Sequence, residues 1–399
     1  MRPELNNSFC YYPFYQLAVK DFNGSLAEVV APCCNMLGFD NPFDYFKKDQ
    51  KETFQEYFYS KPMKKLRNDL LAGKKPECCN SCWVLEKTAK KSIRLHSDCD
   101  MPTDLDFNYE NPKLTTIDLS TGRNCNLSCR MCSPGSSNKL DKEYLQMSDS
   151  QRDILGWSNI KRLEDNRPEN NIAWQNFLSD QGEISVVKAI GGEPFITPDF
   201  INMLDAYIKS GKAKTTELVI TTNATKFNTK NMKLLNHFKH IRLLLSIDAT
   251  EKDYEYIRHP MPWKKLVDSV KNFKNKVTTS YEMIITTPVM LYNIMSLEKL
   301  SNWAESIEID YIYLDTVQNI GRGIDIKHFS KKLLNKVYVS LQHKENIKGP
   351  GLEYIKFNTQ NAVENRHAVL KELEIFDSMR NQTYREFLPK SIVGWLDGE

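Results

Sequence analysis

The chain has 399 residues, and its 54 lysines and arginines against 51 aspartates and glutamates leave a formal net charge of +3. At roughly 100 to 200 residues per domain this length predicts two or three domains, and 41% apolar residues suffice for an ordinary core, which excludes long disorder. A charge so balanced disfavours nucleic acid as the main partner without excluding it. No window approaches the roughly 18 apolar residues of a membrane span, and residues 1–12 lack the pattern of a secretion signal, so a cytoplasmic protein is expected.

The 10 cysteines need a use other than disulfides in a reducing compartment, and metal or iron-sulfur ligation is the usual one. They form two groups, and none follows residue 132. The first group comprises Cys10, Cys33, Cys34, Cys78, Cys79, Cys82 and Cys99. The second group comprises Cys125, Cys129 and Cys132. We therefore predict two separate thiolate sites, one for each group.

The first part of the chain, residues 1–110, is loop-rich and aromatic, with one helical stretch near residues 50–72, which predicts a small domain held together by its cysteines. From residue 114 onward, short β-branched or aliphatic runs alternate with amphipathic helical stretches. The six runs cover residues 114–119, 184–190, 217–222, 241–247, 281–287 and 309–315. This alternation predicts parallel strands joined by right-handed crossovers. Six units are too few for a closed barrel, so an open doubly wound sheet and a partial barrel both fit.

Two further segments stand apart from this alternation. Residues 133–182 are polar and carry Trp157 and Trp174, and one crossover helix would not use them all, so an extra helix or a lid is expected there. After about residue 321 the periodicity becomes helical, with Leu373 and Phe376 on one apolar face. This last segment is expected to form a cap packed on the core.

The second cysteine group lies in the loop directly after the first strand of the alternating region. Loops that follow the carboxyl ends of strands are where α/β folds place their chemistry. The spacing Cys125-x-x-x-Cys129-x-x-Cys132 brings three thiolates close enough to share one metal centre. A structural zinc site normally has four protein ligands, whereas three leave one coordination position open to a reactant. A zinc knuckle remains the alternative on spacing alone.

This motif and its place resemble the signature of radical S-adenosylmethionine (SAM) enzymes. In that family, three cysteines hold three irons of a 4Fe-4S cluster, and the amino and carboxylate groups of SAM chelate the fourth. The resemblance implies an α/β fold, a partial (β/α)6 TIM-like barrel over residues 111–320. A small cysteine-rich N-terminal domain, residues 1–110, would precede the barrel, and a helical C-terminal extension, residues 321–399, would cap it.

A second motif ends the second predicted strand. Gly191, Gly192, Glu193 and Pro194 are similar to the Gly-Gly-Glu-Pro motif of the family, whose backbone and glutamate bind the methionine amino group of SAM. Two glycines let the chain approach a ligand closely, and an acidic group suits an ammonium. The alternative is a tight turn with a surface glutamate.

Further polar residues follow the later strands in the order that the family has. Those implied to contact SAM are Asn223, Ser246, Asp248 and Arg258, the last as a partner of the SAM carboxylate. Asn, Ser and Asp are also ordinary helix N-caps, so each is weak evidence by itself. Asn293 and Gln318 would reach the same end of the sheet but equally suit turns. Met131 stands before the third cysteine, where the family often has an aromatic residue, and its thioether can still pack against adenine.

The early cysteines resemble the SPASM and shorter Twitch modules of the family, which hold an auxiliary iron-sulfur cluster. Such modules usually follow the barrel, and an N-terminal position departs from the common order. The implied ligands are Cys10, Cys33, Cys79 and Cys82, with Cys34 and Cys78 as alternatives for their neighbours. A structural zinc site is the other reading. Cys99 is expected to be a buried, inert thiol.

The basic residues Lys87, Lys90, Lys91 and Arg94 could hold a substrate anion, although a solvated helix surface is favoured.

The resemblance also implies the reaction. A low-potential cluster, supplied with electrons by a reductant such as flavodoxin or ferredoxin, would cleave SAM to methionine and a 5'-deoxyadenosyl radical that abstracts hydrogen from a substrate. A peptide or protein is the expected substrate, because Twitch and SPASM modules are common in peptide-modifying members. A nucleotide, sugar or nucleic acid is the alternative substrate class. A non-enzymatic iron-sulfur or zinc protein, acting as a redox sensor or adaptor, is the alternative of another kind.

Overall fold

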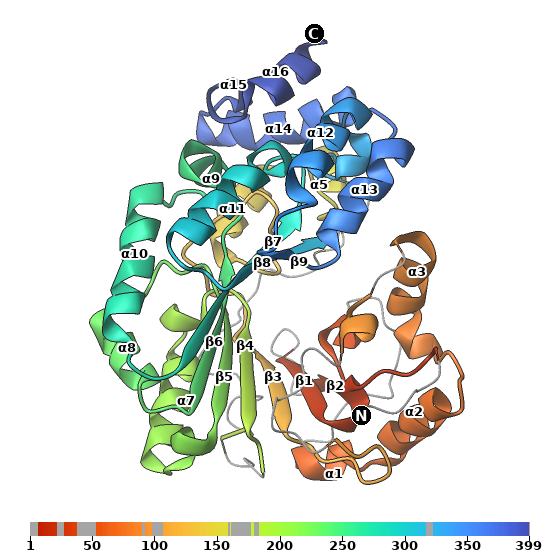
Figure 1. Ribbon diagram of the computed structural model, residues 1–399, viewed down its shortest axis with the longest axis vertical. Coiled ribbons are helices and arrows are strands. Elements are labelled where there is room, and N and C mark those ends of the chain that lie inside the picture. The colour runs from red at the N-terminus through yellow and green to blue at the C-terminus, as the bar shows by residue number, and fades with distance from the viewer. Residues whose placement is uncertain are drawn as a thin grey trace. The chain divides into compact units, whose positions relative to one another are not determined.

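The computed structural model describes residues 7–21, 28–37, 53–89, 92–97, 107–158, 160, 177–178, 183–316 and 322–398 (Figure 1). The strands are β1 (Gln16–Asp21), β2 (Glu28–Ala31), β3 (Thr116–Ser120), β4 (Val186–Ile190), β5 (Glu217–Thr222), β6 (His240–Ser246), β7 (Tyr281–Val289), β8 (Tyr311–Thr316) and β9 (Ile347–Lys348). They form one mixed sheet in the order β2-β1-β3-β4-β5-β6-β7-β8-β9. The six predicted strands are therefore confirmed in type and order as β3 to β8.

The α-helices fall between and after these strands. Those of the first half are α1 (Phe54–Phe58), α2 (Lys61–Leu71), α3 (Asn80–Ala89), α4 (Asp141–Gln146), α5 (Asp149–Ile154), α7 (Pro198–Lys209) and α8 (Thr229–Leu235). Those of the second half are α9 (Glu251–Ile257), α10 (Trp263–Lys276), α11 (Leu297–Ser306), α12 (Lys331–Leu341), α13 (Gly351–Asn361), α14 (Arg366–Arg380), α15 (Tyr384–Phe387) and α16 (Lys390–Asp397). No helix among the described residues is long and apolar enough to cross a membrane.

The chain divides into two compact units. Unit 1 comprises residues 1–122, 164–220 and 234–241, and unit 2 comprises residues 123–163, 221–233 and 242–399. This division does not follow the three predicted segments, whose limits at residues 110 and 320 stay a prediction. Unit 1 instead joins the N-terminal region to the first strands of the alternating region.

The strands of unit 1 explain why the N-terminal region belongs to the sheet. β1 pairs with β2 in antiparallel fashion and with β3 in parallel, so that Leu17 stands opposite Ile117. β3 and β4 continue the parallel ladder, with Ile117 opposite Val187. Leu17 and Ile117 are fully buried, as β-branched and aliphatic residues of a covered sheet are expected to be. The sequence analysis placed no strand in residues 16–31, so this extension of the sheet was missed.

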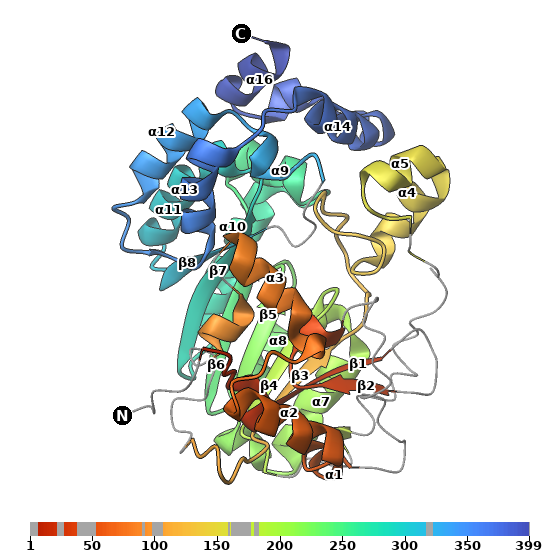
Figure 2. The ribbon, with the colours of Figure 1, turned by 90° about the vertical axis from the view of Figure 1, so that its right-hand side faces the viewer.

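Unit 2 contains the parallel strands β7, β8 and β9, the last of which was not predicted. The predicted helical cap is present as α12 to α16, and α14 packs on α5 (Figure 2). Two short helices, α4 and α5, occupy the described part of the polar segment 133–182, where an extra helix was expected. Trp174 and the rest of that segment lie outside the described residues.

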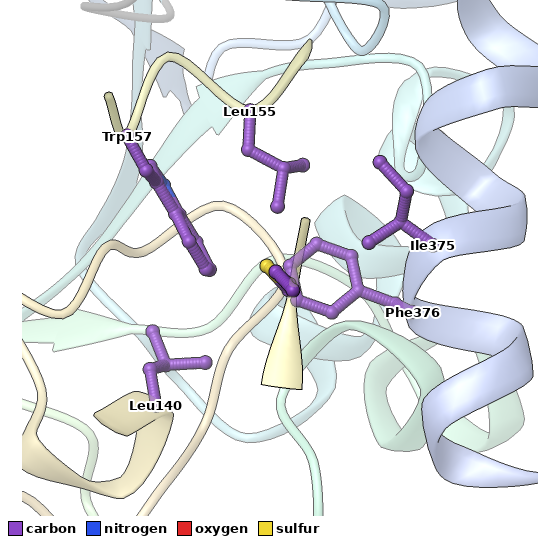
Figure 3. Packing of buried hydrophobic residues seen from close by; sticks show 6 residues of the cluster. Leu140, Leu155, Trp157, Ile375 and Phe376 are labelled. Atoms are coloured by element: carbon purple, nitrogen blue, oxygen red, sulfur yellow. The ribbon is translucent and has the colours of Figure 1, made fainter. Parts of the chain in front are cut away.

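A buried cluster in unit 2 joins this segment to the C-terminal helices. The rings of Trp157 and Phe376 lie 5.9 Å apart, centroid to centroid, in an edge-to-face arrangement. Figure 3 shows Leu140, Leu155 and Ile375 pointing into the same core. Edge-to-face ring pairs add roughly 0.5–1.5 kcal/mol to the burial of the rings. The segment that follows the cysteine motif, from Leu140 to Trp157, therefore packs against α14.

Candidate functional site

The cysteine motif occupies the loop after β3, as predicted, and lies in unit 2. Cys125 and Cys129 are buried, at 7% and 4% exposed, and pack with Leu127. Cys132 is half-buried and packs on the same cluster together with the side chain of Met131. The cysteines described here are all free thiols. Three thiols are thus gathered in an apolar site.

Nitrogen donors surround the sulfurs. The Sγ atom of Cys125 accepts from the backbone N–H of Leu127 at 3.5 Å and from Nδ2 of Asn223 at 3.8 Å. A hydrogen bond between Cys129 and Cys132 raises the pKa of Cys129, with burial adding to the effect, and lowers the pKa of Cys132. Such donors stabilise thiolates, which are the form that binds a metal.

Arg258 is the charged group of this site. It is 8% exposed, and its Nη1 atom lies 3.7 Å from the Sγ atom of Cys129. Its Nε atom donates to Oδ2 of Asp248 at 2.6 Å, and Asp248 is fully buried. Burial opposes the charge, but the Asp248 carboxylate and the Cys129 sulfur outweigh it and raise the pKa of Arg258. The guanidinium is therefore a permanent cation beside the cysteines.

The other oxygen of Asp248 is also occupied. Thr287, on β7, donates through Oγ1 to Asp248 at 2.8 Å, and Nδ2 of Asn293 donates to the same Thr287 hydroxyl at 3.0 Å. Asn293 also closes the turn after β7, because its Oδ1 atom accepts from the N–H of Met290 at 3.0 Å. Asp248 thus holds Arg258 in place, and a direct contact of Asp248 with SAM stays a prediction.

Two more of the predicted contacts lie at strand ends. Asn223 follows β5 and is 5% exposed, and its Oδ1 atom accepts from both the N–H and the hydroxyl of Thr225, at 3.1 and 2.6 Å. Ser246 ends β6 and is half-buried. Gln318 lies outside the described residues.

The motif Gly191–Pro194 lies in unit 1, at the carboxyl end of β4. Gly191 has a φ of +148°, and a Cβ atom there would lie 2.6 Å from Oγ1 of Thr121 and 2.7 Å from the carbonyl oxygen of Gly122. Only glycine fits so close an approach. Glu193 is fully buried, and its carboxylate accepts from the N–H of Phe195 at 3.2 Å, so the alternative of a surface glutamate in a plain turn does not hold.

The four cysteines predicted as ligands of the second site line one cavity in unit 1. Cys10, Cys33, Cys79 and Cys82 all border this cavity, which has a volume of about 20 Å³. Cys34, by contrast, is exposed and does not line the cavity. The arrangement agrees with the choice of ligands made from the sequence, while ligation itself stays a prediction.

These thiols differ in their surroundings. Burial raises the pKa of Cys10 to about 12 and also raises that of Cys33. A hydrogen bond with Cys78 raises the pKa of Cys79, and burial adds to it. Ionisation of these thiols is therefore unfavourable unless a cation is bound beside them.

Arg94 also lines this cavity and is 6% exposed. It donates to both carboxylate oxygens of Glu86, at 2.8 and 2.7 Å, and its guanidinium carbon lies 4.7 Å from the ring centre of Trp83. Arg94 is therefore structural, and the favoured reading of a solvated helix face is wrong for it. Lys90, Lys91 and Cys99 lie outside the described residues.

Sequence reasoning also missed three buried arginines around the cysteine motif, Arg130, Arg322 and Arg380. Only Arg130 carried a signal, since it stands inside the motif.

Comparison with known proteins agrees with the motif. Residues 119–304 match the Radical SAM superfamily. No curated protein matches the chain. Three solved structures illustrate the wider likeness.

The Streptococcus suis protein SuiB bound to S-adenosylmethionine is 16% identical, over 66% of this chain and 54% of that one, with a TM-score of 0.38. Native anSMEcpe with bound AdoMet is 14% identical, over 57% and 59%, with a TM-score of 0.39. SuiB bound to its precursor peptide SuiA is 15% identical, over 74% and 68%, with a TM-score of 0.39. The chain thus spans between half and two thirds of the first two structures.

These observations define an α/β protein with an iron-sulfur type of cysteine motif after the first strand of a parallel sheet. More particularly, residues 119–304 are similar to radical SAM domains, whose cofactors are a 4Fe-4S cluster and SAM. This match supports the expectation of an enzyme.

The three cysteines fit the cluster. Among the described residues, no three His, Cys, Asp or Glu side chains converge on a single ion position. A 4Fe-4S cluster held by three cysteines does not require such convergence, because each sulfur binds a different iron. The buried sulfurs of Cys125 and Cys129, each with a nitrogen donor, match the ligand environment that iron-sulfur clusters use.

Proposed function

We propose that the protein is a radical SAM enzyme that acts on a peptide or protein. The observation that carries the proposal is the gathering of Cys125, Cys129 and Cys132, the first two of them buried, with the Arg258 guanidinium 3.7 Å from the Cys129 sulfur. When bound, the 4Fe-4S cluster and SAM supply reductive cleavage of SAM to a 5'-deoxyadenosyl radical, which abstracts hydrogen from the substrate. The protein supplies ligation, orientation and exclusion of water.

The residues of the site have separable tasks. Asn223 and Arg258 donate toward the cysteine sulfurs, and such hydrogen bonds help to set the reduction potential of a cluster. Asp248 holds Arg258 in one orientation. Arg258 also offers a fixed cation to a carboxylate, which suits the methionine end of SAM. The role of Gly191–Pro194 in binding the methionine amino group rests on the resemblance of this motif to that of the family.

We further propose an auxiliary iron-sulfur cluster in a Twitch-like N-terminal domain, residues 1–110. The support is that Cys10, Cys33, Cys79 and Cys82 line one cavity. The peptide substrate rests on the resemblance of this region to modules of peptide-modifying enzymes. An external reductant, such as flavodoxin or ferredoxin, would deliver the electron.

Anaerobic reconstitution tests the proposal. The wild-type protein should bind about eight irons per chain and form 5'-deoxyadenosine from SAM under reductant, measured by chromatography. Replacing Cys125, Cys129 and Cys132 together by alanine should remove about half of the iron and all of that product. Cys34→Ala is the matched control, because this cysteine is exposed, and it should change neither quantity. A wild-type protein that binds zinc and leaves SAM intact would refute the proposal.

A further inference from the structure

Backbone carbonyls of the cysteine loop, residues 125–132, accept hydrogen bonds from an arginine far along the chain. Arg322 donates through Nη2 to the carbonyl of Arg130 at 3.0 Å and through Nη1 to that of Met131 at 3.1 Å. A guanidinium presents its N–H groups in one rigid plane, so a single arginine can hold two neighbouring carbonyls at once. The two residues directly before Cys132 are thereby fixed.

Arg322 is itself held by a buried carboxylate. Its Nε atom donates to Oε1 of Glu372 on α14 at 3.0 Å, and Nη2 contacts the same oxygen. The Arg322 and Glu372 side chains are 3% and 0% exposed. The second oxygen of Glu372 accepts from the N–H of Ile324 at 3.3 Å. Burying a guanidinium without a counter-charge is strongly unfavourable, so the Glu372 carboxylate stabilises Arg322 in its buried position beside the loop.

The backbone around Arg322 lies directly against α14. A Cβ atom on Gly323 would lie 2.4 Å from the carbonyl oxygen of Ala368, so this contact leaves no space between the segment and the helix. A second link runs from the loop to the same helix, because Nη2 of Arg130 donates to Oδ1 of Asp377 at 2.7 Å. Arg380, at the end of α14, adds a third link, because its Nη2 atom donates to the carbonyl of Ser128 at 2.8 Å. Helix α14 therefore bonds the loop directly through Asp377 and Arg380 and indirectly through Arg322.

We propose that Glu372, acting through Arg322, is a positioning residue of the cysteine site, so that α14 is a working part of that site. The loop backbone sets where the sulfurs lie, and the pair fixes that backbone next to Cys132. The consequence for catalysis rests on the proposed function, whereas the positioning itself concerns contacts of the protein alone. Both residues act through the loop backbone, to which Arg322 donates its two hydrogen bonds.

The first experiment measures the loop in iron-free, full-length protein. The double variant R322M/E372L removes both charges together, so no unpaired charge is left buried. The matched control is R242M/E282L, which removes a 2.8 Å ion pair between β6 and β7 of the same unit. Hydrogen-exchange mass spectrometry should show amides of residues 125–132 exchanging roughly tenfold faster in the first variant, since two charge-assisted hydrogen bonds are lost, and unchanged in the control.

The second experiment measures cluster retention after anaerobic reconstitution. The cluster to follow is the one whose electron paramagnetic resonance spectrum changes when SAM is added. A chelator should remove the iron of this cluster several-fold faster from R322M/E372L than from the wild type and the control. If the wild type shows no such cluster, the proposed function fails, and the exchange measurement alone decides the positioning role.

The inference is overturned if R322M/E372L keeps the wild-type circular dichroism spectrum and exchanges the loop at the wild-type rate. Should that variant not fold, R322K replaces it, because lysine keeps the charge opposite Glu372 but has one nitrogen and cannot hold both carbonyls. Faster loop exchange in R322K supports the role. A wild-type rate in R322K overturns it.

Discussion

Asp248→Asn probes the ion pair that orients the cation of the cysteine site. The Asp248 and Arg258 side chains are 0% and 9% exposed, and one salt link of 2.6 Å joins them. Asparagine has nearly the same shape but no charge, so Arg258 would remain buried without a counter-ion. Breaking one partner of a buried pair typically costs about 3–5 kcal/mol in the free energy of unfolding.

Two further variants separate charge from shape. The double variant D248N/R258M removes the stranded cation, so it should be more stable than D248N, with a coupling of about 2 kcal/mol or more. Glu282→Gln breaks the pair with Arg242, whose side chains are 30% and 20% exposed, and should cost at most about 1 kcal/mol. Urea unfolding of the iron-free proteins, followed by circular dichroism, measures all three. The reasoning is refuted if D248N costs no more than E282Q, or if adding R258M restores nothing.

Three other substitutions test separate contacts. Gly191→Ala places a methyl group 2.6 Å from the Thr121 hydroxyl, so the melting temperature and the affinity for SAM, both measured by calorimetry, should fall. Unchanged values would contradict the need for glycine beside Thr121. Gly323→Ala should destabilise by about 1–3 kcal/mol in urea, because its Cβ would overlap a backbone oxygen, and a neutral result would contradict that packing. Burial raises the pKa of Asp253, so the carboxyl stabilises the fold most below its unfolded value of about 3.9 and loses this contribution as the pH rises through the folded pKa. Asp253→Asn should therefore have a larger free energy of unfolding in urea than the wild type near neutral pH, but not at pH ~3. An equal difference at both pH values would refute the raised pKa of Asp253.

The local alternation of apolar and polar residues was sufficient to predict the strands of the alternating region. In β6, for example, inward and outward residues alternate along His240–Ser246, and that period is visible in the sequence. β1 and β2 also carried a signal, since the apolar run from Leu17 to Val19 precedes Asn23-Gly24, a frequent hairpin turn. The expectation of a loop-rich domain overrode it. The parallel pairing of β1 with β3 joins residues about a hundred positions apart, and no local pattern specifies that.

The cysteine motifs could be predicted because ligand chemistry requires fixed residue types at short spacing. Arg322 and Glu372 could not, because a single arginine and a single glutamate look like surface residues in a sequence. Burial of both depends on a pairing across 50 residues and on contact with the loop. Asp248 illustrates the same limit. It was predicted as a site residue, but its pairing with Arg258 and Thr287 was not.

The bond between Arg130 and Asp377 joins residues 247 positions apart. During synthesis the cysteine motif emerges long before α14. The loop therefore acquires these anchors only after α14 has been made. A truncation that spares every cysteine but removes residues after 321 would therefore leave the loop without the anchors that α14 supplies.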